Sequence, residues 1–158
     1  GYFDGTVFTR VVPHFMAQAG SAHSDSHMEK KKVIGKYTIP DEMKSSHIHK
    51  RGALGAARSY RGNPNKRSNP FSFYFVEGMT YNELTLDHYE KENDYKYSDS
   101  QREYYLKNPG AAHIDGEHTV FGEIIKGYDV VPELTAVETD TQDWPDIDIF
   151  VDKVVVIK

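Results

Sequence analysis

The chain has 158 residues, which suits one domain with a substantial core, and its 38% hydrophobic and 27% charged residues exclude a disordered protein. Its net charge of −5 excludes a general electrostatic affinity for nucleic acid or anionic lipid, and no apolar run approaches the roughly 20 residues of a membrane-spanning helix. The chain has no cysteine, so disulfides and thiolate chemistry are excluded as well.

The first part of the chain predicts strands joined by polar loops. Thr6–Val12 alternates as a half-buried strand does, Pro13 interrupts it, and Phe15–Gln18 predicts a second strand beside the first. Residues 21–32 are polar without an apolar period, so we expect a loop there. Gly52–Arg58 is small and apolar, and its two glycines favour a strand that other backbone approaches closely over a helix.

The second part begins with the clearest strand, Phe71–Val76, which is aromatic and rich in β-formers. Beyond Gly78 the sequence becomes charged and rich in tyrosine, and Ser98 with Gln101 forms a capping-box pattern at a helix start. The elements expected here are helices at 85–93 and 98–107, a strand at 118–125, a short helix at 128–137 and a last strand at 150–157.

These elements predict a mainly β protein. About five or six strands with short helices and glycine-rich turns are typical of an all-β barrel or sandwich. The two charged helices are too short to build a core of their own. We therefore expect a single domain over residues 1–158 with a helical insert at about 79–110.

Chemistry-bearing side chains gather in the first strand pair. The guanidinium of Arg10 and the amide of Gln18 stand beside the apolar Phe15 and Met16, with no nucleophile nearby. Such a group can bind a carbonyl-bearing, partly hydrophobic ligand such as a peptide. The same residues also fit a core strand with a surface arginine.

Four segments, in chain order, resemble the cyclophilin family of peptidyl-prolyl cis-trans isomerases. They are Phe8–Gly20 (FTRVVPHFMAQAG), Ile39–Arg58 (IPDEMKSSHIHKRGALGAAR), Ser72–Gly78 (SFYFVEG) and Asp115–Gly127 (DGEHTVFGEIIKG). The resemblance covers nearly the whole chain apart from residues 79–110, which resemble an excursion of some bacterial cyclophilins of the Bacteroidetes type.

The resemblance implies a cyclophilin-like closed antiparallel β-barrel with short helices. Family members begin with two strands and a helix before the position that matches Gly1. We therefore expect the N-terminal strands to be missing from this chain, and either a preceding segment or another chain to complete the barrel.

The resemblance also implies a proline-binding site. Arg10 matches the catalytic arginine of the family, and Gln18 matches the amide that orients it and contacts the substrate. The apolar floor that takes the proline ring is matched by Phe15, Met16 and Phe75. The reaction breaks no covalent bond and needs no acid, base or metal, so we expect no cofactor.

Further positions match the groove around this floor, and some depart from the family pattern. The matching positions are Ala57, Arg58, Ile114 and His118. Phe73 stands where the family usually has a glutamine that helps to bind the peptide, and His113 where many members carry a tryptophan. We expect these departures either to reduce activity or to alter the substrate preference.

Metal binding is not favoured. Eight histidines include His23 and His27 four residues apart, but their surroundings are polar and loop-like, and no carboxylate pattern completes a site. Paired carboxylates such as Asp146 and Asp148 suit a solvated approach to the last strand.

Two functions remain open. One is an active isomerase that assists folding, as a chaperone does, by acting on proline-containing polypeptides. The other is a weakly or non-catalytic cyclophilin-fold subunit that binds a stable protein partner, through its tyrosine-rich insert or its groove, in a larger envelope assembly. The insert and a start at Gly1 without methionine lead us to expect a periplasmic or envelope-associated protein, with a cytoplasmic one as the alternative.

Overall fold

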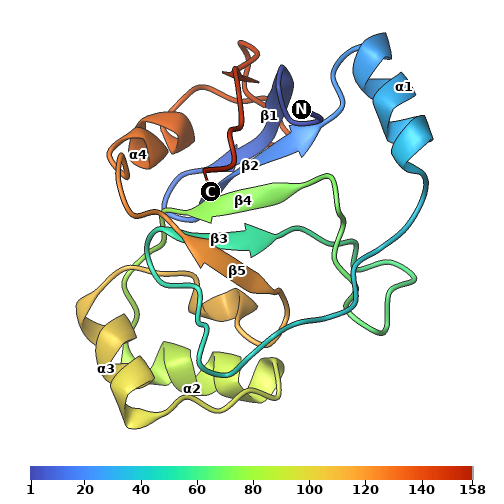
Figure 1. Cartoon of the computed structure of the whole chain (residues 1–158). Helices are drawn as coiled ribbons and strands as arrows, with labels where there is room; N and C mark the ends of the chain where they lie inside the picture. The colour runs from blue at the N-terminus through green and yellow to red at the C-terminus, as the bar shows by residue number, and fades with distance from the viewer. Residues whose placement is uncertain (158) are drawn as a thin grey trace.

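One six-stranded sheet forms the centre of the computed structural model, which describes residues 1–157 (Figure 1). The strands follow the order β5-β3-β4-β2-β1-β6, and every neighbouring pair is antiparallel. They are β1 (Thr6–Val12), β2 (Met16–Ser21), β3 (Ala53–Ala56), β4 (Phe73–Val76), β5 (Val120–Glu123) and β6 (Phe150–Val151). The prediction of an antiparallel sheet with short helices is confirmed, but the description as mainly β is not, because the helices contain more residues than the strands.

The closed barrel is not confirmed. Within residues 1–157, β5 pairs with β3 alone and β6 with β1 alone, so no hydrogen bonds join the two edges of the sheet. The last strand is also shorter than the predicted 150–157, because β6 has two residues and residues 152–157 are exposed outside the sheet.

The prediction of a loop over 21–32 is wrong, because a helix, α1 (Asp25–Ile34), occupies most of this segment. Ser24 caps it by accepting a hydrogen bond from the His27 backbone N–H, and Gly35 ends it at a φ of 92°. The helix buries one side chain, His27, and its apolar residues Met28, Val33 and Ile34 are exposed. A helix without an apolar stripe gives no periodic signal, so only its caps could have predicted it.

Both helices of the 79–110 segment are confirmed, as α2 (Glu83–Glu92) and α3 (Asp99–Lys107), and the capping box between Ser98 and Gln101 is present. The short helix η1 (Ala112–Ile114) follows them, and α4 (Val130–Thr135) confirms the predicted helix at 128–137. Figure 1 shows α2 and α3 side by side, beyond the β5 edge of the sheet.

The tyrosines of this segment form its core. They pack as edge-to-face ring pairs, such as Tyr81 with Tyr105 at 5.5 Å between ring centroids. The buried members of this helical cluster are Ile48, Tyr81, Leu86, Tyr97, Tyr105 and Ala112. These aromatic side chains therefore stabilise the helical pair.

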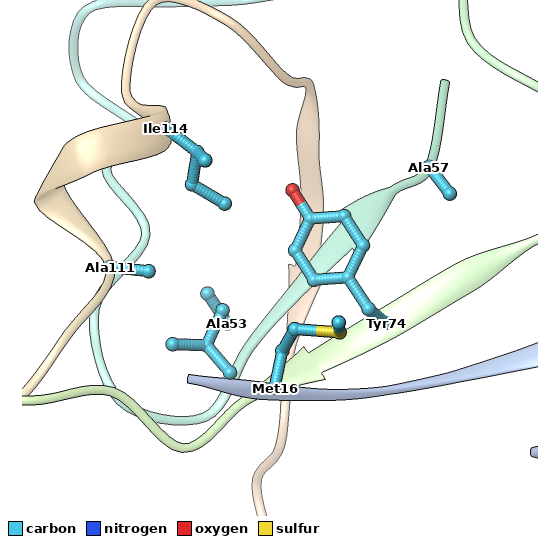
Figure 2. Packing of buried hydrophobic residues seen from close by; sticks show 7 residues of the cluster. Met16, Ala53, Ala57, Tyr74, Ala111 and Ile114 are labelled. Atoms are coloured by element: carbon cyan, nitrogen blue, oxygen red, sulfur yellow. The ribbon is translucent and has the colours of Figure 1, made fainter. Parts of the chain in front are cut away.

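The central strands divide their side chains between two apolar clusters, one on each face of the sheet. On one face, Met16, Tyr74 and Val76 pack with small residues and with Ile114 of η1, as Figure 2 shows for most of this cluster. On the other face, Phe73 and Phe75 pack against a second cluster. Its buried members are Phe8, Val11, Ala17 and Ala19. The face that holds Met16 and Tyr74 also carries the candidate site.

Candidate functional site

A cavity of about 390 Å³ opens on the face of the sheet that holds Met16 and Tyr74. Its walls come from β1, β2, β4, η1 and the segments that follow β3 and η1. The lining residues are Arg10, Phe15, Met16, Gln18, Ala57, Arg58, Tyr60, Tyr74, His113, Ile114 and His118. The structure thus brings together all but two of the predicted site residues, from segments far apart in the sequence.

The two exceptions are Phe73 and Phe75, which do not line the cavity. Side chains alternate along a strand, and Phe73 and Phe75 lie on the opposite face, against Ala17 and Ala19. Tyr74 takes the place expected for an aromatic wall residue, directly opposite Gln18 in the register between β2 and β4. The correction is therefore a shift of one residue along β4, which moves every side chain to the other face.

A β-bulge turns Arg10 toward the cavity. The register between β1 and β2 shifts between Phe8, which pairs with Ala19, and Arg10, which pairs with Gln18. Strict alternation would place Phe8 and Arg10 on one face, yet Phe8 is buried in the second cluster and Arg10 lines the cavity. One extra residue in β1 re-aims the guanidinium, as bulges beside binding sites do.

Asp143 holds this guanidinium, although no sequence pattern indicates this role. The Arg10 Nε–H donates to Asp143 Oδ2 at 2.9 Å, and the guanidinium carbon lies 5.9 Å from the centre of the Phe15 ring. The Asp143 carbonyl accepts a 2.9 Å hydrogen bond from the Val11 N–H, so β1 itself fixes the position of the carboxylate. The amide of Gln18, expected to orient Arg10, contacts Thr9 Oγ1 at 3.5 Å instead.

Replacing Asp143 by asparagine should therefore lower kcat/KM for an Ala-Pro peptide. Both side chains are about two-fifths exposed, and such ion pairs contribute about 0.2–1 kcal/mol, which corresponds to a loss of about 1.4- to fivefold. The difference should shrink in about 1 M salt, where charges are screened within about 3 Å. Asp146→Asn, on the same loop but exposed, is the matched control, and equal activity of both variants would contradict the role of Asp143.

The guanidinium of a second arginine, at the rim of the cavity, is bound to other residues of the protein. The Arg58 side chain is buried, its Nη2 forms an ion pair with Glu117, and its Nε–H donates to the Glu117 carbonyl at 2.5 Å. The Tyr60 ring covers its guanidinium at 4.0 Å, and Lys66 Nζ lies 2.5 Å from the second Glu117 oxygen. Arg58 therefore shapes the rim, and Arg10 is the guanidinium that faces the cavity with donors to spare.

His118 is a neutral wall of the cavity. Burial lowers its pKa to about 4, although the hydrogen bond to the Ala56 carbonyl, at 3.2 Å from Nδ1, opposes the shift. With the proton on Nδ1, the ring accepts a 2.9 Å hydrogen bond from the Tyr60 hydroxyl at Nε2. His113 also lines the cavity, with its ring centroid 4.5 Å from that of Phe15, and burial lowers its pKa as well.

His118 should make folding stability depend on pH in the acid range. Because the unfolded chain binds a proton near the ordinary pKa of about 6.5 and the folded chain near 4, stability should fall as pH drops between these values. The loss should approach about 3 kcal/mol below pH 4, with no contribution above about pH 7. Denaturant unfolding at several pH values should show a flatter profile for His118→Gln, whereas the exposed His47→Gln should keep the wild-type slope.

The other histidines and the helices offer no further centre of this kind. Among the residues described, no group of three or more His, Asp or Glu side chains is arranged to hold a metal ion. His27 bonds to Ser24 and to the Asp4 carbonyl, whereas His23 faces Asp148 at 3.5 Å. None of the helices within residues 1–157 is long and apolar enough to cross a membrane.

The sequence matches the model of a known family of proteins. The family model for "Cyclophilin type peptidyl-prolyl cis-trans isomerase/CLD" matches residues 1–156. The chain therefore belongs to the cyclophilin-type peptidyl-prolyl cis-trans isomerases. The resemblance of residues 79–110 to Bacteroidetes-type cyclophilins stays a prediction.

Individual relatives agree with this family. The chain is 28% identical over 157 residues to a Streptococcus pyogenes protein named "Putative bifunctional phosphatase/peptidyl-prolyl cis-trans isomerase", covering 98% of this chain and 31% of that protein. It is 27% identical over 158 residues to the "Putative peptidyl-prolyl cis-trans isomerase" of Staphylococcus saprophyticus, covering 100% of this chain and 75% of that protein. The chain thus spans less than a third of the first relative and three-quarters of the second.

A solved structure supports the fold. The cyclophilin-type isomerase of Cryptosporidium parvum, solved in the presence of the dipeptide Ala-Pro, superimposes with a TM-score of 0.64. The match covers 100% of this chain and 78% of that one at 19% sequence identity, so it bears on the fold alone.

Proposed function

We propose that the full-length protein catalyses the cis-trans isomerisation of X–Pro bonds in polypeptides, with the prolyl ring in the 390 Å³ cavity and Arg10 beside the rotating bond. The observation that carries this proposal is the presence of Arg10 and apolar walls in one cavity. Asp143 takes the Nε–H of Arg10, and the two Nη groups carry further donors for a ligand.

The arrangement suits a reaction that is a rotation. Resonance stiffens the peptide bond, and its loss in the twisted state gives a barrier of about 18–20 kcal/mol. The proline nitrogen then becomes pyramidal and carries a lone pair, which a positioned guanidinium can hydrogen-bond. Phe15, Met16 and Tyr74 hold the ring by apolar contact, so that one side of the bond turns while the other stays fixed.

The free energies that Arg10 and the apolar walls contribute to catalysis can be compared. Stabilising the twisted state by roughly 7 kcal/mol would accelerate the rotation about 10⁵-fold. Removing one preorganised donor from an enzyme site typically costs about 2.7–4 kcal/mol. Burial of the ring and its positioning must therefore contribute the remaining stabilisation, about 3–4 kcal/mol.

Magnetisation exchange between the cis and trans signals of an Ala-Pro peptide tests the proposal without a coupled assay. Substoichiometric full-length protein should speed the exchange far above the uncatalysed rate, which has a time constant of about tens to hundreds of seconds. Exchange at the uncatalysed rate, with the protein shown to be folded, would favour the alternative of a non-catalytic cyclophilin-fold subunit.

One argument for the alternative, a non-catalytic cyclophilin-fold subunit that binds a protein partner, is weakened. Tyr81, Tyr97 and Tyr105, which suggested a partner surface on the insert, are buried within the helical cluster. The proposal of proline-containing polypeptides as substrates stands on the cavity and the family, and that of an envelope location stands on the resemblance alone.

A further inference from the structure

A chain of buried hydrogen bonds runs from α3 to the wall of the cavity. The Tyr105 hydroxyl donates to Asp115 Oδ2 at 2.5 Å, and Asp115 Oδ1 lies 2.7 Å from His49 Nδ1. His49 Nε2 in turn lies 2.8 Å from the Tyr74 hydroxyl. The four residues are between 0% and 3% exposed. Such a network is rigid because every polar group in it has its partner away from water.

The hydrogen-bonding capacity of each group fixes the direction of the chain. The Asp115 carboxylate accepts from Tyr105, from the His49 ring and, at 2.8 Å, from the His49 backbone N–H. Burial raises the pKa of Tyr74 well above its ordinary value, so its hydroxyl keeps its proton and donates to His49 Nε2. With the ring proton of His49 on Nδ1, Nε2 accepts from Tyr74, and each donor in the hydrogen-bond chain has one acceptor.

The residues packed around Tyr74 hold its ring in a single position. The ring stacks on His49 with centroids 5.9 Å apart and planes 15° apart, and the ring of His118 meets its edge at 5.8 Å. Gly55 of β3 lies opposite Tyr74 in the register, and a Cβ on Gly55 would lie 2.2 Å from Tyr74 Cζ. The aromatic wall of the cavity is thus held from β3, from the segment before it and, through Asp115, from α3.

We propose that Tyr105, Asp115 and His49 are positioning residues that fix the Tyr74 ring and thereby fit the cavity to the five-membered ring of proline. This inference rests on the proposed isomerase function. It gives residues 79–110 a role in the site, because Tyr105 on α3 begins this series of hydrogen bonds and does not itself line the cavity.

Tyr105→Phe removes one hydroxyl from the far end of the chain and leaves the cavity lining unchanged. Measured well below the melting temperature of the variant, kcat/KM for an Ala-Pro peptide should fall about two- to tenfold. The preference for proline over its six-membered homologue, pipecolic acid, should narrow, because a mobile Tyr74 no longer defines the width of the cavity. A merely structural loss would lower the melting temperature and leave this preference unchanged.

Tyr104→Phe is the matched control, because Tyr104 is the neighbouring residue on α3 and its hydroxyl bonds to the Pro109 carbonyl, outside the chain. This variant should keep both the rate and the ring preference of the wild type. A double-mutant cycle with Tyr74→Phe completes the test. Once the Tyr74 hydroxyl is absent, adding Tyr105→Phe should change kcat/KM no further.

The outcomes separate this inference from the function on which it rests. A folded wild-type protein without isomerase activity overturns the proposed function and the positioning role together. An active wild-type protein whose rate and ring preference survive Tyr105→Phe overturns the positioning role alone. Additive effects of Tyr74→Phe and Tyr105→Phe in the cycle would also overturn it, because independent sites add.

Discussion

Arg10→Ala is expected to lower kcat/KM for an Ala-Pro peptide by about 10²- to 10³-fold while the protein stays folded. The physical reason is that Arg10 supplies the charged donor for the nitrogen lone pair of the twisted bond, and removing one such preorganised donor from an enzyme site costs a loss of this size. Because Arg10 is partly exposed and its ion pair with Asp143 contributes little to stability, the melting temperature should change little. Magnetisation exchange on the peptide and thermal unfolding measure the two effects.

Two further variants test whether the loss comes from the donors of Arg10 itself. Arg10→Lys keeps the charge but has no planar fork of donors and no Nε–H for Asp143, so its rate should fall between those of wild type and Arg10→Ala. Arg51→Ala removes an arginine that stacks on Tyr128 and does not line the cavity, and it should retain the wild-type rate. Equal exchange rates for wild type and Arg10→Ala would leave the enzymatic proposal without its charged element.

The first half of the site could be predicted from the sequence because it is contiguous. Arg10, Phe15, Met16 and Gln18 lie within two paired strands and the turn that joins them, so their spacing alone brings them near one another. What the sequence could not show is the bulge beside Arg10. A bulge inserts one residue without any distinctive residue type, and it decides which face of the sheet the guanidinium reaches.

The second half depended on the resemblance, and its error came from register. Phe73, Tyr74 and Phe75 are all aromatic, so the pattern of residue types does not show which of them faces the cavity. Gly55 of β3 leaves space for a ring, but a glycine in a strand equally indicates the close approach of backbone, so its presence alone does not identify Tyr74. Asp143 had no signal at all, because its partner lies 133 residues away in the chain and its loop has no periodic pattern.

The sequence predicts the fold best where the hydrophobic periodicity agrees with the capping and turn residues. The central strands and the capped helices α2 and α3 stand at their expected places. Helix α1 gives no periodic signal because it has no buried apolar stripe. The last strand is shorter than its apolar run suggests, because such a run carries no information about its hydrogen-bonding partner. Pairing at the sheet edges depends on contacts distant in sequence, which local patterns do not encode.

The largest effect on the architecture of the site is expected from Gly55→Ala, which should abolish most activity and destabilise the protein by about 1–3 kcal/mol. The backbone of Gly55 needs no positive φ, so the cost is steric: the new Cβ would lie 2.2–2.4 Å from three atoms of the Tyr74 side chain. The Tyr74 ring cannot yield, because its hydroxyl is bonded to the buried His49. A fall in Tm of about 5–10 °C and the loss of peptide exchange should appear together.

The neighbouring strand offers a matched glycine. A Cβ on Gly122 of β5 would meet Leu54 at 3.4 Å, an ordinary contact, so Gly122→Ala should leave both stability and rate close to wild type. If the Tyr74 ring is the source of the cost, Gly55→Ala should destabilise far less in a Tyr74→Leu background, where the ring is absent. Activity should stay low in that double variant, because the space is relieved but the wall of the cavity is gone. An unchanged cost of Gly55→Ala in both backgrounds would instead place the strain in the backbone of β3 and separate Gly55 from the site.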